Sequence, residues 1–255
     1  MSDDILVTSV ENGIGRLRLN RADKRNALNE PLARAILETM EQMDADDAVH
    51  VIMVEGTDGS FCAGADMGEA LAAAEAGDRR FNPSHDAASR IASSEKPTIA
   101  KIDGPAYGAG ALLACGCDLR VMSDRSRMRF PGSDYGLVVG AAGLTPLVGP
   151  VLAKELIFTS RVVEAEEALR IGLANRVVPA DELEAEALDL ANAVAAGSPL
   201  AARWAKQVIN AAASGGDAVG IEAQADLVLR GGADHMARFG KATKRIVGRS
   251  SGGSS

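Results

Sequence analysis

Residues 97–122 read PTIAKIDGPAYGAGALLACGCDLRVM. The apolar run 97–102 predicts a buried strand, and residues 103–110 form a glycine-rich turn directly behind it. Small apolar residues at 111–115 then predict a short helix, and residues 118–122 predict another strand. A strand, a turn, a helix and a strand in direct succession are typical of an α/β fold.

A similar succession stands upstream of this stretch. The β-branched run 49–55 predicts a buried strand that ends in the loop 56–65, and residues 67–77 predict a helix. The polar segment 78–85 predicts a mobile loop, and a further helix is expected at 87–94. The chain therefore repeats the order strand, small-residue loop, helix at least twice.

The N-terminal residues predict a β-hairpin. Apolar and polar residues alternate at 5–10 and at 14–19, and Asn12-Gly13 between them favours a tight two-residue turn. A polar loop follows as far as Asn29, and Pro31 is expected in the first turn of the next helix.

The sequence after Val151 predicts helices almost throughout. We divide the chain into an α/β core at 1–195, a helical region at 196–248 and a flexible Ser/Gly-rich tail at 249–255. The helices expected in the C-terminal part cover 181–196, 199–213, 217–239 and 241–247.

Composition and charge exclude several classes of protein. Hydrophobic residues make up 47% of the chain, enough for a sizeable core. The net charge of −8 argues against a nucleic-acid-binding protein, which normally carries a basic face. No apolar run approaches the roughly 18 residues that span a membrane, and residues 1–4 do not resemble a signal peptide. We expect a cytoplasmic protein that binds neither nucleic acid nor membrane.

The three cysteines predict neither disulfides nor a metal site. Their number is odd, and Cys115-x-Cys117 has no second cysteine pair and no nearby histidine. We expect Cys62, Cys115 and Cys117 to be small buried thiols, and we expect no metal.

Two small-residue turns are the strongest candidates for a functional site. They read SFCAGADM at 60–67 and GPAYGAGA at 104–111, and each joins a predicted strand to a predicted helix. Small residues let a ligand approach the backbone, and free N–H groups at a helix start favour negative charge. Two such N–H groups converging on one point would form an oxyanion hole. From glycine content alone, two tight strand-to-helix connections remain the alternative.

The sequence resembles the enoyl-CoA hydratase/isomerase (crotonase) family over nearly its whole length. Residues 26–29 resemble the family's first CoA loop, and residues 61–66 and 103–110 resemble its two oxyanion segments. The stretch AEEALRIGLANRVVP at 165–179 is similar to the family's most recognisable downstream segment. Four motifs in the family's order make the resemblance specific.

This resemblance implies a crotonase-like spiral of ββα units whose last helices mediate a homotrimer or a hexamer of two trimers. It also implies an acyl-CoA substrate, with CoA carried as part of the substrate and no separate cofactor. The backbone N–H groups of Ala65 and Ala109 would form the oxyanion hole, although the family usually has glycine at position 109. The residues expected to contact the thioester or the CoA are Lys24, Arg25, Ala27, Ala63, Gly64, Ala65, Asp66, Met67, Tyr107, Gly108, Ala109, Gly110, Leu112, Ser133 and Tyr135.

The catalytic acid is where this chain departs from the family pattern. Hydratases of the family use two glutamates, and the first would stand at Leu112, which cannot accept a proton. The second would stand at Asp134, four residues after Phe130. One carboxylate suits an enoyl-CoA isomerase, in which a single base moves a proton between two carbons. We expect Asp134 to be that base, buried beside an apolar acyl chain; the alternative for Asp134 is a surface turn residue.

Four other interpretations remain open. The missing glutamate allows an acyl-CoA-binding homologue without activity, and an ordinary hydratase remains the alternative within the family. A serine hydrolase is disfavoured because no GxSxG elbow is present and only His50, His85 and His235 are available. A nicotinamide oxidoreductase is disfavoured because Gly108-x-Gly110 lacks the third glycine of its fingerprint.

Overall fold

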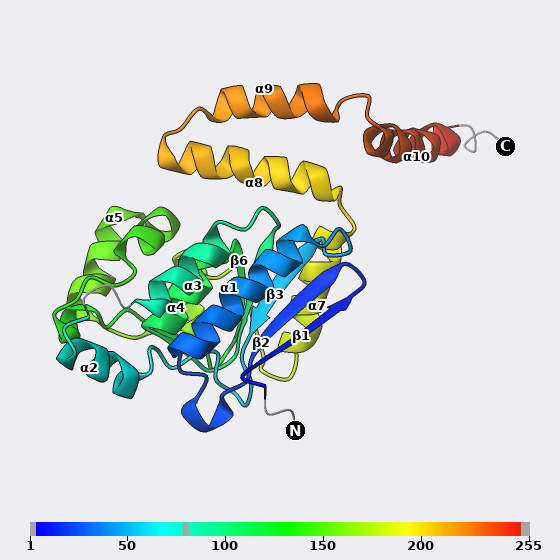
Figure 1. The fold of residues 1–255 in the computed structure, drawn as a ribbon. Helices are drawn as coiled ribbons and strands as arrows, with labels where there is room; N and C mark the ends of the chain where they lie inside the picture. Colours follow the sequence, from blue (N-terminus) through cyan, green and yellow to red (C-terminus); the bar gives the residue numbers. More distant parts are fainter. Residues whose placement is uncertain (1–3, 79–81, 251–255) are drawn as a thin grey trace. The chain divides into compact units, whose positions relative to one another are not determined.

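The computed structural model describes residues 4–78 and 82–250. It divides into two compact units, Met1–Ala196 and Gly197–Ser255. Both units are drawn in Figure 1.

A six-stranded sheet forms the centre of the first unit (Figure 1). Its strands are β1 (Leu6–Glu11), β2 (Ile14–Leu19), β3 (Val51–Glu55), β4 (Thr98–Ile102), β6 (Leu119–Ser123) and β9 (Arg176–Val178). They lie in the order β1-β2-β3-β4-β6-β9, with β1 antiparallel to β2 and all the other neighbours parallel. Parallel neighbours require crossover connections, which the intervening helices supply.

The predicted hairpin is confirmed. Leu6 pairs with Leu19 at one end of the antiparallel ladder, and Glu11 pairs with Ile14 at the other. The turn residues Asn12 and Gly13 have φ values of 52° and 81°. Two successive positive φ angles define the tight turn whose twist matches that of the flanking strands, which is why Asn-Gly is preferred there.

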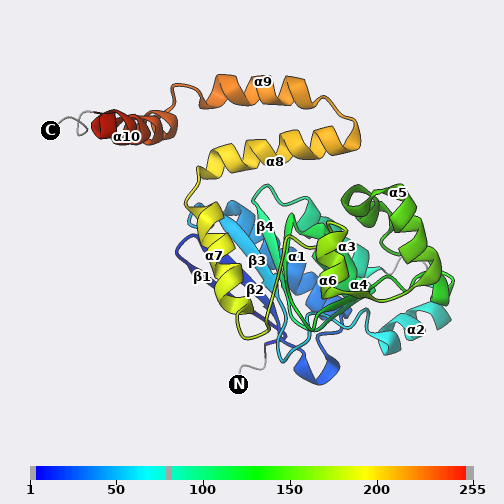
Figure 2. The same cartoon turned by 180° about the vertical axis from the view of Figure 1, so that it is seen from behind.

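Helices cover both faces of the sheet, so the parallel strands are buried on two sides. One face is covered by α1 (Glu30–Ala45), α3 (Pro83–Ala92) and α4 (Ala109–Gly116), and the opposite face by α7 (Leu183–Ala195) (Figures 1 and 2). Along β3, Ile52 and Val54 belong to the cluster on the first face, whereas Val51 and Met53 pack with α7. This two-sided burial explains the uninterrupted apolar run in the sequence.

The α1 helix begins as expected. The Asn29 side chain accepts a hydrogen bond from the Leu32 N–H at 3.1 Å, and Pro31 lies in the first turn. The cap satisfies one of the amides that a helix start leaves without a partner.

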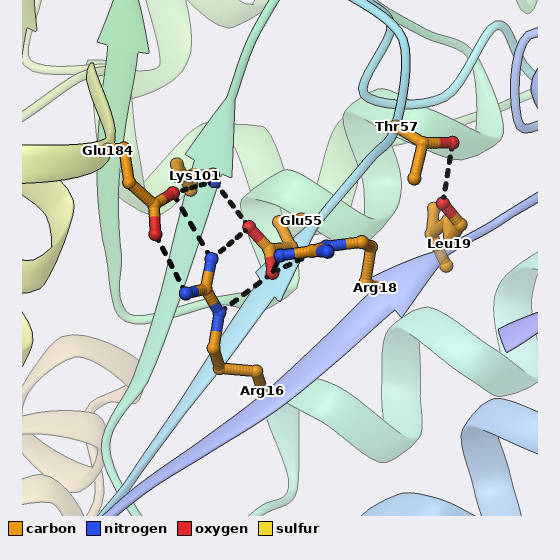
Figure 3. A network of polar contacts seen from close by, with 7 residues as sticks. All are labelled: Arg16, Arg18, Leu19, Glu55, Thr57, Lys101 and Glu184. Carbon is orange, nitrogen blue, oxygen red and sulfur yellow. Dashed lines mark hydrogen bonds and ion pairs between the residues drawn. The ribbon is translucent and has the colours of Figure 1, made fainter. Parts of the chain in front are cut away.

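A charged network lies on the α7 face of the sheet (Figure 3). Glu55 is fully buried and accepts two hydrogen bonds from Arg16, at 2.9 and 2.8 Å, and one from Arg18 at 3.0 Å. Lys101 on the neighbouring strand forms ion pairs with both Glu55 and Glu184 of α7. Burial raises the pKa of Glu55, but hydrogen bonds from Arg16 and the charge of Lys101 outweigh burial and hold the pKa below its usual value.

A second, three-stranded sheet consists of β5 (Pro105–Tyr107), β7 (Arg127–Arg129) and β8 (Val163–Glu164). β5 runs parallel to β7, and β7 runs antiparallel to β8. The remaining helices of the first unit are α2 (Met67–Glu75), α5 (Ala141–Thr159) and α6 (Ala165–Arg170). β5 leads directly into α4, so this small sheet positions the second glycine turn.

The second unit consists of α8 (Pro199–Ser214), α9 (Ala218–Leu229) and α10 (Ala233–Ser250). α8 and α9 pack against each other and run in opposite directions (Figure 1). Apolar side chains remain exposed on these helices: Ile209, Val219, Leu227, Val228, Met236, Phe239 and Ile246.

Several expectations about the C-terminal half are wrong. The sequence after Val151 contains two strands, β8 and β9, besides its helices. The helix expected at 217–239 breaks at residues 230–232, where Gly231 has a φ of 79°. Residues 249 and 250 of the expected flexible tail belong to α10, and residues 251–255 lie outside the described residues.

Two further expectations are corrected upstream. α3 begins at Pro83, so His85 lies in a helix rather than in a loop; residues 79–81 of the expected loop lie outside the described residues. α5 has 19 residues with a hydropathy of 1.3, so by length and composition it could cross a membrane. That test is weak for a single helix, and Gly149, with φ 77° and ψ 163°, interrupts the helical geometry.

Candidate functional site

The first small-residue turn is held in place by parallel β-bridges on both sides. Leu28 bridges to Ala65, and Cys62 bridges to Ala106. The amides of Leu28 and Asp66 donate to Gly64 O and Leu28 O, both at 2.8 Å. In this pattern the amide of Ala65 faces away from Leu28. Gly64 has a φ of 127°, a conformation that residues with a side chain rarely adopt.

The second turn packs directly against the first. Gly108 has a φ of 50° and immediately precedes α4, and its N–H donates to Arg129 O at 3.0 Å. A Cβ added to Gly110 would lie 2.2 Å from Cys62 O, so only glycine fits there. A Cβ added to Gly108 would lie 3.9 Å from the Cα of Gly64. The two turns are therefore neighbours in space although more than 40 residues separate them in sequence.

The structure leaves the two expected donors unused. Among the hydrogen bonds of the described residues, the N–H groups of Ala65 and Ala109 donate to no acceptor. Ala109 is the first residue of α4, where helix geometry supplies no carbonyl partner. A free amide at a helix start favours a developing negative charge. Both amides thus have the chemical character that an oxyanion hole requires.

The expected CoA segment is fixed to the first turn. η1 (Ala22–Lys24) is followed by Arg25 and Asn26 with φ values of 50° and 57°. The Ala63 N–H donates to Arg25 O at 3.0 Å, which ties the segment to the oxyanion turn. The side chains of Lys24 and Arg25 are exposed, and Ala27 is half-buried. Two exposed cations at this loop can approach the phosphates of a ligand.

Asp66 and Met67 stand where the first turn enters α2. Asp66 forms an ion pair with Arg21 at 3.1 Å, and the hydrogen bond from Arg21 lowers the pKa of Asp66. The same guanidinium donates to Ala27 O at 2.5 Å. Met67 is 61% exposed and begins a helix with no buried residue. The start of α2 is therefore open to a ligand.

The Asp134 region differs from the expectation. η2 (Ser133–Tyr135) is exposed, and the Asp134 carboxylate forms an ion pair with Arg129 at 2.6 Å. The expectation of a buried carboxyl is wrong, because a surface turn followed by Gly136 carries the residue and a neighbouring guanidinium holds it. The Ser133 hydroxyl donates to Ile157 O at 2.6 Å and anchors the turn to α5.

Leu112 and Tyr135 provide apolar surface rather than charge. Leu112 is half-buried on α4, and a Cβ added to Gly140 would lie 3.4 Å from Leu112 Cδ2 and 2.9 Å from Phe130 Cδ1. Leu112 therefore lies beside Phe130, at the segment that connects η2 to α5. Tyr135 is 57% exposed and Tyr107 is half-buried.

Burial disfavours the reactive thiolate form of two of the three cysteines. Burial raises the pKa of Cys62 and of Cys115 to about 11. Cys62 and Cys117 are buried as expected, whereas Cys115 is only partly so. Within residues 4–78 and 82–250, no group of three or more His, Cys, Asp or Glu side chains could hold a metal ion.

Sequence reasoning missed Arg21 and Arg129, and it assigned Asn26 to the CoA loop without predicting its buried hydrogen bonds. Arg21 and Asn26 are polar residues in a predicted loop, where solvent exposure is the ordinary expectation. Arg129 lies in the three-residue strand β7, too short to give an alternating pattern. Their contribution to the site becomes visible only when segments distant in sequence pack together.

Comparisons with known proteins give one consistent result. A family model described as "Enoyl-CoA hydratase/isomerase" matches residues 9–240. A "Probable enoyl-CoA hydratase" of Rhizobium meliloti is 36% identical over 213 residues, covering 82% of each chain. A "Short-chain-enoyl-CoA hydratase" of Clostridium acetobutylicum is 34% identical over 210 residues, covering 80% of each. The crystal structure of an enoyl-CoA hydratase from Bacillus anthracis is similar with a TM-score of 0.90, 26% identity and coverage of 95% of this chain and 97% of that one.

Proposed function

Because the chain belongs to the enoyl-CoA hydratase/isomerase family, we propose that it isomerises an enoyl-CoA thioester through an enolate. The family and the crotonase-like α/β fold with a C-terminal helical region are as expected from the sequence. Family membership implies an enzyme that acts on an acyl-CoA. The assignment to isomerisation rather than hydration is our proposal.

One observation carries the proposal. Two neighbouring amides, on Ala65 and Ala109, are without acceptors among the described residues. The helix that begins at Ala109 carries Leu112 where the resemblance places the first glutamate of a hydratase. Free amides stabilise a thioester oxygen as it gains negative charge. A leucine cannot hold the water that hydration adds. The site therefore favours chemistry at the α-carbon without addition of water.

The proposed reaction needs one base that also serves as the acid. The Asp134 carboxylate removes a proton from C2 of a 3-enoyl-CoA, and the electron pair moves onto the thioester oxygen between the two amides. The enolate then collapses, C4 takes the same proton from Asp134, and a 2-enoyl-CoA results. Atoms balance without a cofactor, since CoA is part of the substrate. Asp134 must leave or share its ion pair with Arg129 when substrate is bound.

The experiment offers trans-3- and trans-2-enoyl-CoA of several chain lengths to the wild type and to Asp134→Asn. We expect conversion of the 3-enoyl to the 2-enoyl ester in the wild type, followed by chromatography and mass spectrometry, and its loss in the variant. Asp226→Asn is the matched control, because Asp226 is also an exposed aspartate paired with an arginine, Arg230. It should retain activity.

Two other outcomes would replace the proposal. Prompt formation of 3-hydroxyacyl-CoA would make the chain a hydratase, as the names of its relatives suggest, with its acid placed elsewhere. Binding of CoA esters without any conversion would make it a non-catalytic acyl-CoA-binding homologue, the alternative that the absent glutamate at Leu112 leaves open.

The proposal also covers the oligomeric state of the protein and its cellular compartment. The exposed apolar side chains on the helices of the second unit support a homotrimer, or a hexamer of two trimers, because large apolar surfaces usually mark contacts between chains. We place the protein in the cytoplasm. Sedimentation velocity of the full chain tests the assembly.

A further inference from the structure

Asn26 is the most completely bonded polar side chain near the candidate site. It is fully buried. Its Oδ1 accepts from the Arg21 N–H at 2.9 Å and lies 3.2 Å from the Thr57 hydroxyl. Its Nδ2 donates to Thr57 O at 3.2 Å and to Ser60 O at 2.7 Å. The Thr57 hydroxyl has one hydrogen and also lies 3.1 Å from Leu19 O, so both donor hydrogens of Asn26 and at least one of its two acceptor positions are occupied.

These bonds join the CoA segment to the start of the oxyanion segment. Ser60 O accepts from Asn26, and the Ser60 hydroxyl donates to Arg25 O at 3.2 Å. Three residues further along, Ala63 donates to the same carbonyl of Arg25 at 3.0 Å. The segment 60–66 is thus fixed to the CoA segment at its beginning by Asn26 and near its end by the bridge at Ala65.

The backbone around Asn26 explains why asparagine occupies this position. Arg25 and Asn26 both have positive φ, 50° and 57°. Asparagine adopts this region more readily than most residues with a side chain. Aspartate has the same shape but no donors, so it would place a charge opposite the carbonyl oxygens of Thr57 and Ser60. Alanine would leave both carbonyl oxygens without that donor.

The room around the segment is too small for it to adjust. A Cβ added to Gly56 would lie 2.1 Å from Ser60 O, and one added to Gly104 would lie 2.0 Å from Gly59 O. The first contact closes segment 56–61 on itself, and the second presses it against the turn at Gly104, so the segment is tightly packed. A change in the Asn26 bonds has few ways to relax other than a shift of residues 60–66.

We propose that Asn26 is a positioning residue that sets the orientation of the Ala65 N–H by fixing segment 60–66 to the CoA segment. It touches neither substrate nor reacting atoms. The inference rests on the proposed function, because it assumes that the Ala65 amide polarises the thioester carbonyl. Its consequence is that loss of the Asn26 amide weakens carbonyl polarisation even when the ligand fully occupies the site.

The test measures polarisation directly. Butyryl-CoA carrying ¹³C at the thioester carbon is saturated and can be neither isomerised nor hydrated. Its carbonyl stretching band is recorded by infrared difference spectroscopy with the site saturated. We expect a shift to lower frequency in the wild type, and loss of at least half of that shift in Asn26→Ala and Asn26→Asp. With a turned-over substrate, kcat should fall about 10- to 100-fold at saturation.

Ser94→Ala is the matched control for a general loss of stability. Ser94 is a buried polar residue whose hydroxyl bonds to Asp44 at 2.6 Å, away from both oxyanion segments. It should lower the melting temperature and leave the carbonyl shift unchanged. If Asn26→Ala does not fold, Thr57→Val removes one hydroxyl of the same network and is expected to give a smaller loss of the shift.

The outcomes are distinguishable. A wild-type shift that persists in the Asn26 variants at saturation, or that Ser94→Ala reduces equally, overturns the role of Asn26 and leaves the proposed function standing. If the wild type shows no shift, the amides do not polarise the thioester carbonyl, and both the proposed function and the role of Asn26 are refuted.

Discussion

Replacing Gly110 with alanine should separate the two oxyanion segments. The added Cβ would lie 2.2 Å from Cys62 O and 2.8 Å from the Cβ of Cys62. To restore an ordinary contact, α4 and residue 62 must move apart by about 1 Å. Overpacking of this kind costs about 1–3 kcal/mol of unfolding free energy. A misplacement of about 1 Å at reacting groups costs on the order of 100-fold in rate.

The assay compares urea unfolding and initial rates of enoyl-CoA conversion for Gly110→Ala with those of a matched glycine variant. Gly143→Ala adds the same methyl group, but there the new Cβ meets only the Cβ of Cys115, at 3.8 Å. That variant should be as stable as the wild type or up to about 1 kcal/mol more stable, because alanine favours a helix. If Gly110→Ala keeps wild-type stability and rate, the two turns do not act as one rigid site, and the reasoning is refuted.

Four further predictions concern stability, pH and binding. Ser160→Gly should raise the unfolding free energy by about 1–2 kcal/mol, because Ser160 has a φ of 48° and its buried hydroxyl has no hydrogen-bond partner among the described residues; a lower melting temperature would contradict this. Glu55→Gln should destabilise the fold by about 3–5 kcal/mol at neutral pH. Because the folded-state pKa of Glu55 is lowered, its stabilising contribution is present above its unfolded pKa of 4.5 and is lost as pH falls through the folded pKa. The difference in stability from the wild type should therefore disappear in acid, and a difference that stays constant with pH would contradict the role of the network. Glu184, whose pKa is lowered to about 2, should lose its contribution between about pH 4.5 and 2, as urea titrations of Glu184→Gln would show. Lys24→Ala should raise the Kd for CoA about three- to tenfold at low salt and less at high salt, measured by calorimetry; an effect independent of salt would exclude a phosphate contact.

The N-terminal half of the fold follows closely from local sequence signals. Asn12-Gly13 requires positive φ at both positions and so determines the hairpin and its register. The strand expected at 97–102 begins one residue before β4, and the strand expected at 118–122 is displaced by one residue from β6. These elements were predictable because a two-sided sheet demands a continuous apolar run, which a single sequence displays.

The errors arise where an element depends on a distant partner. β9 has three residues, and its pairing with β6 rather than its own pattern makes it a strand. The exposure of Asp134 follows from the turn at residues 133–136 and from Arg129, neither of which the family motif encodes. The burial of Asn26 was not predictable because two of its three bonding partners, Thr57 and Ser60, lie more than 30 residues further along the chain.

The proposed donors are main-chain amides, and this affects how the protein tolerates genetic change. Every side chain attached at position 65 or 109 leaves its N–H in place, and only proline deletes it. Random substitution of side chains around the site would therefore alter which acyl chain fits, while the two amides that activate the thioester remain. Substitutions that change substrate preference can therefore accumulate without loss of thioester activation. The glycines that hold the amides in position, Gly64, Gly108 and Gly110, are the positions where substitution should abolish activity.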